Sequence, residues 1–72
     1  MARPTALIKD VLSGRTMLKD SSRAIQSACE FHFYKAARAV MSQPAGNRKE
    51  MINTIPANLH DRIRHYARMI GK

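Results

Sequence analysis

The sequence predicts an all-α fold, a small bundle of three to four helices, and three observations support this. Apolar residues recur at helical spacing in three separate stretches of the chain. Glycine and proline interrupt the pattern at Ser13-Gly14 and again within residues 43–46. Asn and Asp residues typical of helix starts precede the last two helical segments. We therefore expect a short N-terminal helix, a long central helix and a helical hairpin that leads to a C-terminal helix.

The chain has 72 residues, which make one small basic domain covering residues 1–72. A chain this short buries only a modest share of its surface, and its single cysteine, Cys29, excludes an internal disulfide. Stability then depends on tight packing or on a second copy of the chain. The sequence leaves two arrangements open, a compact bundle and an intertwined homodimer.

A short first helix is predicted to begin at Pro4 and to end at Ser13-Gly14. Proline suits the first turn of a helix, and glycine suits the position just after its last turn. The apolar residues of this segment fall on a single stripe: Leu7, Ile8, Val11 and Leu12.

The main helix is predicted to run from Thr16 to Gln43. The Asp-Ser-Ser segment at residues 20–22 offers a later start, because these side chains can cap a helix. Residues 23–42 are helical in either case. The predicted inward line consists of Leu18, Ile25, Cys29, His32, Ala36 and Val40. Further residues widen this line: Met17, Ala24, Ala28, Phe31 and Met41.

The apolar stripe of the main helix is wider than one neighbouring helix can cover. Four of its residues cannot all face one hairpin partner: Met17, Ala24, Phe31 and Phe33. Part of the stripe is therefore expected to contact a second copy or another protein. The candidates for this dimer or partner interface are Ile25, Cys29, Phe33 and Val40.

The segment Gln43-Pro44-Ala45-Gly46 is the clearest break in the chain and predicts a helical hairpin. Asn47 and Glu50, three residues apart, indicate a capped short helix that ends before Pro56. Asn58 and Asp61 repeat this capping pattern before the last helix. The last helix ends at Gly71, and its inward line consists of Leu59, Ile63, Tyr66 and Ile70.

Residues 51–63, Met-Ile-Asn-Thr-Ile-Pro-Ala-Asn-Leu-His-Asp-Arg-Ile, resemble the opening of ribbon-helix-helix DNA-binding proteins, where a short β-strand precedes a proline and an amphipathic helix. The resemblance covers about a quarter of the chain. It implies a strand that enters the major groove as part of a dimer, with Asn53 and Thr54 as candidate base-reading residues. Residues 48–54 are otherwise expected to form a helical turn. A helix-turn-helix built from the last two helices is a further alternative.

Thirteen Lys and Arg residues against five Asp and Glu give a net charge of +8. Residues 1–43 carry seven basic and three acidic groups and residues 44–72 carry six and two, so the excess is even along the chain. This charge favours anionic partners, namely DNA or RNA, an acidic protein surface or an anionic membrane.

The outward face of the last helix carries the densest run of positive charge. Its basic residues are Arg62, Arg64, His65, Arg68 and Lys72. Arg48 and Lys49, near the hairpin turn, extend this face. Arginine pairs with phosphate or carboxylate in two-point geometry, so these residues are candidate contacts to nucleic acid or to an acidic partner. The alternative is a solvated face that Asp61 partly balances.

A second basic line runs along the main helix and is interrupted by Glu30. It contains Arg15, Lys19, Arg23, Lys35 and Arg38. Tyr34 lies beside this line and could stack on a base or on a partner side chain, although one aromatic residue does not make a stacking platform. Solubility is the simpler explanation of the line.

The residue types needed for catalysis or metal binding do not come together in the sequence. The five acidic residues are isolated from one another and offer no carboxylate pair for acid-base work. His32 lies on the inward line, while His60 and His65 are five residues apart and do not share a helix face. Cys29 has apolar neighbours and is expected to be a small buried hydrophobe. We expect no enzyme activity, no cofactor and no metal.

Two function classes follow from these observations. The first is a dimeric nucleic-acid-binding regulator that contacts phosphates through the C-terminal helix. The second is a non-enzymatic inhibitor or adaptor of the kind phages encode, which docks a helix face on an acidic host protein. A free thiol and the lack of an export signal favour the cytoplasm, and no apolar run reaches membrane-spanning length.

Overall fold

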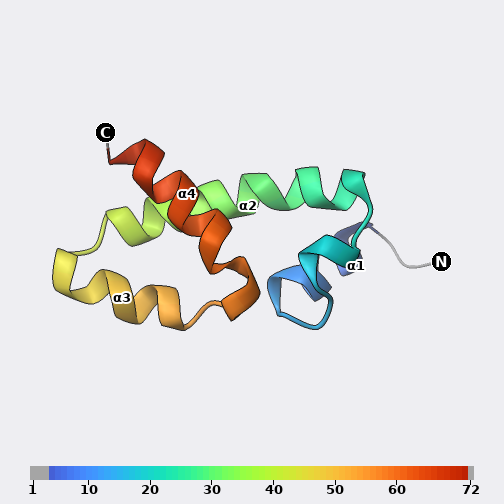
Figure 1. The fold of residues 1–72 in the computed structure, drawn as a ribbon, viewed down its shortest axis with the longest axis horizontal. Coiled ribbons are helices and arrows are strands. Elements are labelled where there is room, and N and C mark those ends of the chain that lie inside the picture. Colours follow the sequence, from blue (N-terminus) through green and yellow to red (C-terminus); the bar gives the residue numbers. More distant parts are fainter. Residues whose placement is uncertain (1–3, 72) are drawn as a thin grey trace.

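The computed structural model describes residues 4–71 of the chain, and this part is all-helical. The prediction of an all-α bundle is confirmed, and the residues described contain no strand. In chain order (Figure 1) the elements are α1 (Pro4–Leu12), the 3₁₀ turn η1 (Leu18–Asp20), α2 (Arg23–Met41), α3 (Ala45–Asn53), the 3₁₀ turn η2 (Ala57–Leu59) and α4 (His60–Ile70).

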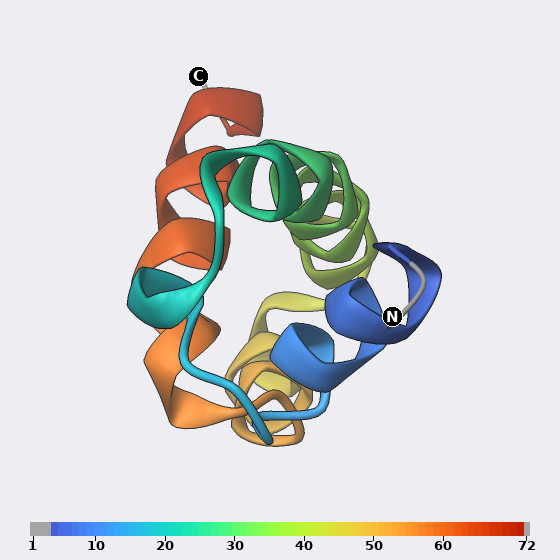
Figure 2. The same cartoon turned by 90° about the vertical axis from the view of Figure 1, so that its right-hand side faces the viewer.

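The long helix α2 is the element on which the others pack. The helix α4 crosses α2 and runs in the same general direction (Figure 1). The helix α3 runs in the opposite direction to α2 and lies below it in this view. Seen along the molecule, α1, α2, α3 and α4 surround one interior (Figure 2). The core cluster consists of Val11, Ile25, Cys29, Phe33, Ala37, Leu59 and Ile63. Because α2 supplies every fourth residue from 25 to 37, one straight line along it faces the interior.

This line differs from the predicted inward line at two residues, because Phe33 and Ala37 are buried where His32 and Ala36 were predicted. His32 is exposed, so its placement in the core is wrong. The four residues predicted to form a dimer or partner interface are all buried inside the single chain: Ile25, Cys29, Phe33 and Val40. Three of them, Ile25, Cys29 and Phe33, belong to the core cluster together with residues of α1 and α4. The oligomeric state itself stays a prediction.

The start of α2 follows the later of the two predicted boundaries. The Ser22 hydroxyl oxygen accepts a hydrogen bond from the Ile25 N–H at 3.3 Å and so caps the helix. The preceding residues form η1 and a bend, and a helix unbroken from Thr16 is therefore wrong. The Gln26 side-chain amide donates to the Ser21 carbonyl at 2.9 Å, which secures the same turn.

The end of α1 depends on Gly14, as predicted. Gly14 has φ of +83°, a conformation that side chains with a Cβ atom disfavour. The Arg15 N–H donates to the Asp10 carbonyl at 2.9 Å and the Gly14 N–H donates to the Val11 carbonyl at 3.1 Å, which is the Schellman arrangement. A Cβ atom at Gly14 would lie 3.1 Å from Cβ of Pro56, so this turn sits directly on the α3–η2 connection.

The predicted capping pairs at Asn47 and Asn58 are wrong. Pro44 takes the N-cap position of α3, so this helix begins at Ala45, before Asn47 can cap it. A 3₁₀ turn runs directly into α4, whose N-cap, Leu59, makes no side-chain bond. The two prolines already fix the backbone ahead of each helix, and this decides where the helices begin.

The helix α3 extends through Asn53, so the short strand implied by the ribbon-helix-helix resemblance does not form. The alternative expectation, a helical turn over residues 48–54, is confirmed, because these residues lie within α3 and its C-cap, Thr54. The helix-turn-helix alternative fits no better, because α3 and α4 each pack chiefly on α2.

Candidate functional site

A cluster of three polar side chains joins α2 to α4. The Arg62 guanidinium donates two hydrogen bonds to the Glu30 carboxylate, from Nε to Oε1 at 3.0 Å and from Nη2 to Oε2 at 3.1 Å. The Tyr66 hydroxyl donates to the same Oε2 at 2.6 Å. Arg62 and Tyr66 are one helical turn apart on α4, so a single carboxylate fixes both side chains. We call these three residues the Glu30 cluster.

The cluster shifts the acid-base behaviour of its members. Partial burial pushes the pKa of Glu30 up, but the hydrogen bonds from Arg62 and Tyr66 outweigh it and leave that pKa below its ordinary value. The hydrogen bond to Glu30 raises the pKa of Tyr66, since ionised tyrosine would place a second negative charge beside the carboxylate. The same partner raises the pKa of Arg62. Near neutral pH the cluster is therefore an ionised pair with a neutral tyrosine.

Arg62 is thus paired with Glu30, although 40% of its side-chain surface stays exposed. Its contact to phosphate or to an acidic partner stays a prediction. Among residues 4–71 the pair of Arg62 with Glu30 is the one ion pair within 4.0 Å, so it also satisfies the acidic group that interrupts the basic line of α2. The other lysines and arginines described therefore have no carboxylate partner within 4.0 Å, and their charges are free to interact with a ligand.

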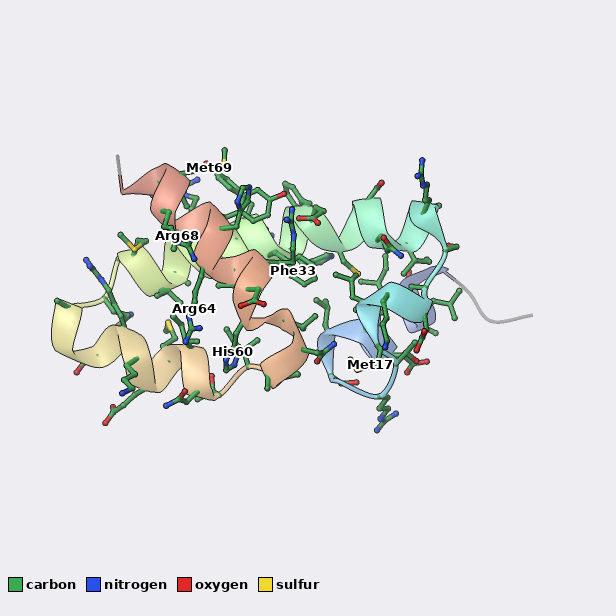
Figure 3. All side chains as sticks on the ribbon, viewed as in Figure 1. Met17, Phe33, His60, Arg64, Arg68 and Met69 are labelled. Atoms are coloured by element: carbon green, nitrogen blue, oxygen red, sulfur yellow. The ribbon has the colours of Figure 1, made fainter. Side chains whose placement is uncertain are left out.

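Arg64 and Arg68 are exposed and lie one turn apart on the opposite side of α4 from Arg62. In Figure 3 Arg64 reaches from α4 toward α3, whereas Met69 points away on the other side. The two arginines border an open cleft of about 470 Å³, which we call the Met41 cleft. Its apolar floor consists of Met41, Ala67 and Gly71.

Arg48 comes to the same end of α2 from α3. Its Nη2 donates at 3.2 Å to the carbonyl of Met41, the last residue of α2, and its Nε donates at 3.1 Å to the Gln43 carbonyl in the connection that follows. Arg48 thus contacts the backbone of Met41, whereas Arg64 and Arg68 line the Met41 cleft. Lys49 is exposed on α3, and Lys72 lies outside the described residues.

Exposed apolar side chains lie on the other side of α4 and on the part of α2 beside it. Two of them were named from the sequence, Phe31 on the apolar stripe and Tyr34 as a candidate for stacking, but Met69 was not. Phe31 is 63% exposed, Met69 is 57% exposed and Tyr34 is 41% exposed. The ring of Tyr34 packs edge-on against Tyr66, with centroids 6.0 Å apart, and Met69 follows Tyr66 by one turn. Phe31, Tyr34, Tyr66 and Met69 form what we call the aromatic face, which spans α2 and α4.

Basic groups border this aromatic face. The Lys35 ammonium lies 5.2 Å from the centroid of the Phe31 ring, and the Arg62 guanidinium lies 5.6 Å from that of Tyr66. His65 packs edge-on against Tyr66 at 5.3 Å, and Arg38 is exposed one turn beyond Tyr34. The helical spacing of residues 31, 34, 35 and 38 could have indicated this surface, had Phe31 not been placed on the apolar stripe.

The remaining candidate groups are the acidic residues, the histidines and the thiol of Cys29. Within residues 4–71 no three His, Cys, Asp or Glu side chains meet in a way that could hold a metal ion. Burial first, and then the nearby Glu30 charge, raise the pKa of the Cys29 thiol, so the reactive thiolate is disfavoured. The ring of His60 is engaged with the Ile55 carbonyl, 2.6 Å from Nε2. None of the described helices has the length and apolar character needed to cross a membrane.

No protein-family model matches this chain, and comparisons with curated proteins and with solved structures found no match either. Function is therefore inferred from the residues and their geometry.

Proposed function

We propose that this chain is a nucleic-acid-binding protein that holds the phosphate backbone with the exposed arginines of α4. The observation that supports this most directly is the position of Arg64 and Arg68, exposed and one turn apart. Neither arginine has a carboxylate within ion-pairing distance among the residues described. Two guanidinium groups at this spacing suit consecutive phosphates of a strand.

The surroundings of the two arginines support the same function. Arg48 adds a third guanidinium at the end of α2, where two of its N–H groups are used by the Met41 and Gln43 carbonyls. Exposed Lys49 adds charge on α3. Asp61 is exposed at the start of α4 and would repel phosphate, so the strand is expected to contact the C-terminal half of that helix.

The test is the salt dependence of binding to a fluorescently labelled oligonucleotide, measured by anisotropy. The double variant Arg64→Ala/Arg68→Ala should bind more weakly and should flatten the log-log slope against salt by roughly two. The matched control, Lys9→Ala/Arg15→Ala, removes the same charge from exposed positions at α1 and its following turn. It should change the slope far less.

Absence of binding to both DNA and RNA at low salt would exclude the proposed function. If the two double variants weaken binding equally, the net charge of the chain determines the affinity, and the position of Arg64 and Arg68 does not.

A second candidate function is docking on an acidic protein, as an inhibitor or adaptor. The Met41 cleft favours it, because an apolar floor flanked by arginines suits an aliphatic side chain with neighbouring carboxylates. Capture of one acidic protein from nuclease-treated host lysate, in equal stoichiometry and lost in Arg64→Ala/Arg68→Ala, would favour this function over nucleic-acid binding.

A further inference from the structure

We infer that the nucleic acid is single-stranded and that its unpaired bases stack on Phe31 and Tyr34 of the aromatic face. This inference rests on the proposed function and adds the class of strand and the residues that hold its bases. It concerns the side of α4 opposite the Met41 cleft.

Most of the large apolar side chains that are exposed in residues 4–71 lie on the aromatic face. Single exposed apolar residues are normal on small proteins, but a contiguous group marks a contact surface. Of the large apolar side chains exposed in residues 4–71, Leu7 and Met17 lie at α1 and the turn that follows it, while the other three belong to the aromatic face. Phe31 is the most exposed of them, and its ring contacts only its helix neighbours His32 and Lys35 among the aromatic and cation contacts of the described residues.

The side chains that border the aromatic face are mainly basic. Lys35 and Arg38 flank the face on α2, and His65 flanks it on α4. The acidic group nearest to the face, Glu30, is already engaged by Arg62 and Tyr66. A second copy of the same face would bring these cations together across a two-fold axis, which is unfavourable. The face suits a partner that carries negative charge and flat apolar groups. A single strand has both, because its phosphates are anionic and its unpaired bases are flat.

Contacts within the chain hold the rings of Tyr66 and Tyr34 in place before any ligand binds. The hydrogen bond from Tyr66 to Glu30 fixes the Tyr66 ring, and the edge-on contact passes this constraint to Tyr34. A side chain held in place before binding loses less conformational entropy when a base stacks on it. Tyr66 therefore acts as a positioning residue, and Tyr34 and Phe31 are the contact residues.

Duplex nucleic acid cannot stack its bases on the rings of the aromatic face. Its base faces are stacked on one another, so only its phosphates and groove edges can reach the rings. A single strand passing over the exposed ridge of α4 can place phosphates at Arg68 and bases at Tyr34 and Phe31. Single strands are therefore expected to bind more tightly than duplexes of the same length.

The test compares labelled oligo-dT with a duplex of equal length in anisotropy titrations. Phe31→Ala and Tyr34→Ala should each weaken single-strand binding by about 5-fold to 150-fold, the range found for stacked bases, and leave duplex binding within about two-fold. Leu7→Ala, an exposed apolar residue away from the face, is the control and should change neither. Circular dichroism should show unchanged helix content in all three variants.

Phe31→Trp gives an independent readout. The chain contains no tryptophan, so this variant has a single indole at the stacking position. It should retain single-strand affinity, and saturating oligo-dT should quench its fluorescence, whereas duplex should quench it little.

Two results would overturn the inference. One is unchanged single-strand affinity in both alanine variants together with no quenching in Phe31→Trp. The other is a dimer, detected by light scattering, that Phe31→Ala dissociates, because the face would then join two copies. If nucleic acid still binds through Arg64 and Arg68 in these cases, the proposed function stands and only the stacking role fails.

Discussion

Glu30 and Arg62 lie 32 residues apart in the chain and meet through two parallel hydrogen bonds of 3.0 and 3.1 Å. This pair connects the middle of α2 to the first turn of α4, next to the core residue Ile63. Because Tyr66 shares the same carboxylate, the pair also sets the position of the aromatic face. Its loss is expected to affect both the stability of the fold and the order of that surface.

Replacing Glu30 with Gln should reduce the free energy of unfolding by about 1 kcal/mol, because the charge-assisted bonds become neutral ones. The value is modest since the Arg62 and Glu30 side chains keep 40% and 30% of their surface exposed, and solvent screens the pair. Urea denaturation followed by circular dichroism measures the change. Glu50→Gln, at an exposed position on α3, is the control, and equal losses in the two variants would contradict a specific role for Glu30.

Acid should weaken the fold through the same carboxylate. Folding lowers the pKa of Glu30 below its ordinary value of 4.5, so the unfolded chain binds a proton there more readily than the folded chain. The stabilisation is present above that ordinary value and is lost as the pH falls through the lower pKa of the folded state. Denaturation between about pH 6 and pH 3 should show a steeper decline for the native chain than for Glu30→Gln. Parallel profiles would contradict this assignment.

Two glycine-to-alanine substitutions should have opposite effects. Gly14→Ala should destabilise the fold by about 1 to 2 kcal/mol, because its positive φ disfavours a Cβ atom and Pro56 leaves little room for one. Gly46→Ala should stabilise it by about 0.5 kcal/mol, since this residue is helical and a Cβ atom there meets nothing within 4 Å. Thermal unfolding of both variants gives the comparison, and a stabilising Gly14→Ala would show that the turn is not rigid.

Two phenylalanines two positions apart on α2 should differ sharply in their effect on stability. Phe33 is 1% exposed, and Phe33→Ala should cost about 3 to 5 kcal/mol, enough to unfold much of so small a domain. Phe31 is 63% exposed, and Phe31→Ala should change stability by less than about 0.5 kcal/mol. Chemical denaturation of the two variants tests this, and similar losses would mean that Phe31 packs within the fold.

Local signals in the sequence were sufficient to predict the order of the helices and the breaks after α1 and α2, but not where α3 and α4 begin. Gly14 ends α1, and the break at residues 43–46 separates α2 from α3, because these residues restrict or permit particular backbone angles whatever surrounds them. The capping pairs failed for a related reason, since Pro44 and Pro56 fix the chain before Asn47 and Asn58 can act.

The surfaces were harder to predict because they depend on how the helices pack. The sequence placed Phe31 and Phe33 on one broad stripe, and only the position of α4 decides which ring is covered. Arg62 was grouped with Arg64 and Arg68 as an outward residue, although its partner lies on a different helix. Arg64 and Arg68 were correctly placed on the exposed surface of the last helix, since their positions follow from helical periodicity alone.

The buried thiol of Cys29 offers a way to follow the motions of this domain. It is the one sulfhydryl in the chain, and it lies in the cluster formed with Leu59 and Ile63 of the C-terminal segment. A thiol reagent can reach the sulfur only while that segment is detached from α2, so the rate of alkylation reports how often the two separate. A ligand that bridges α2 and α4 would slow this labelling. The alkylation rate of Cys29 would then report whether a ligand is bound at the aromatic face.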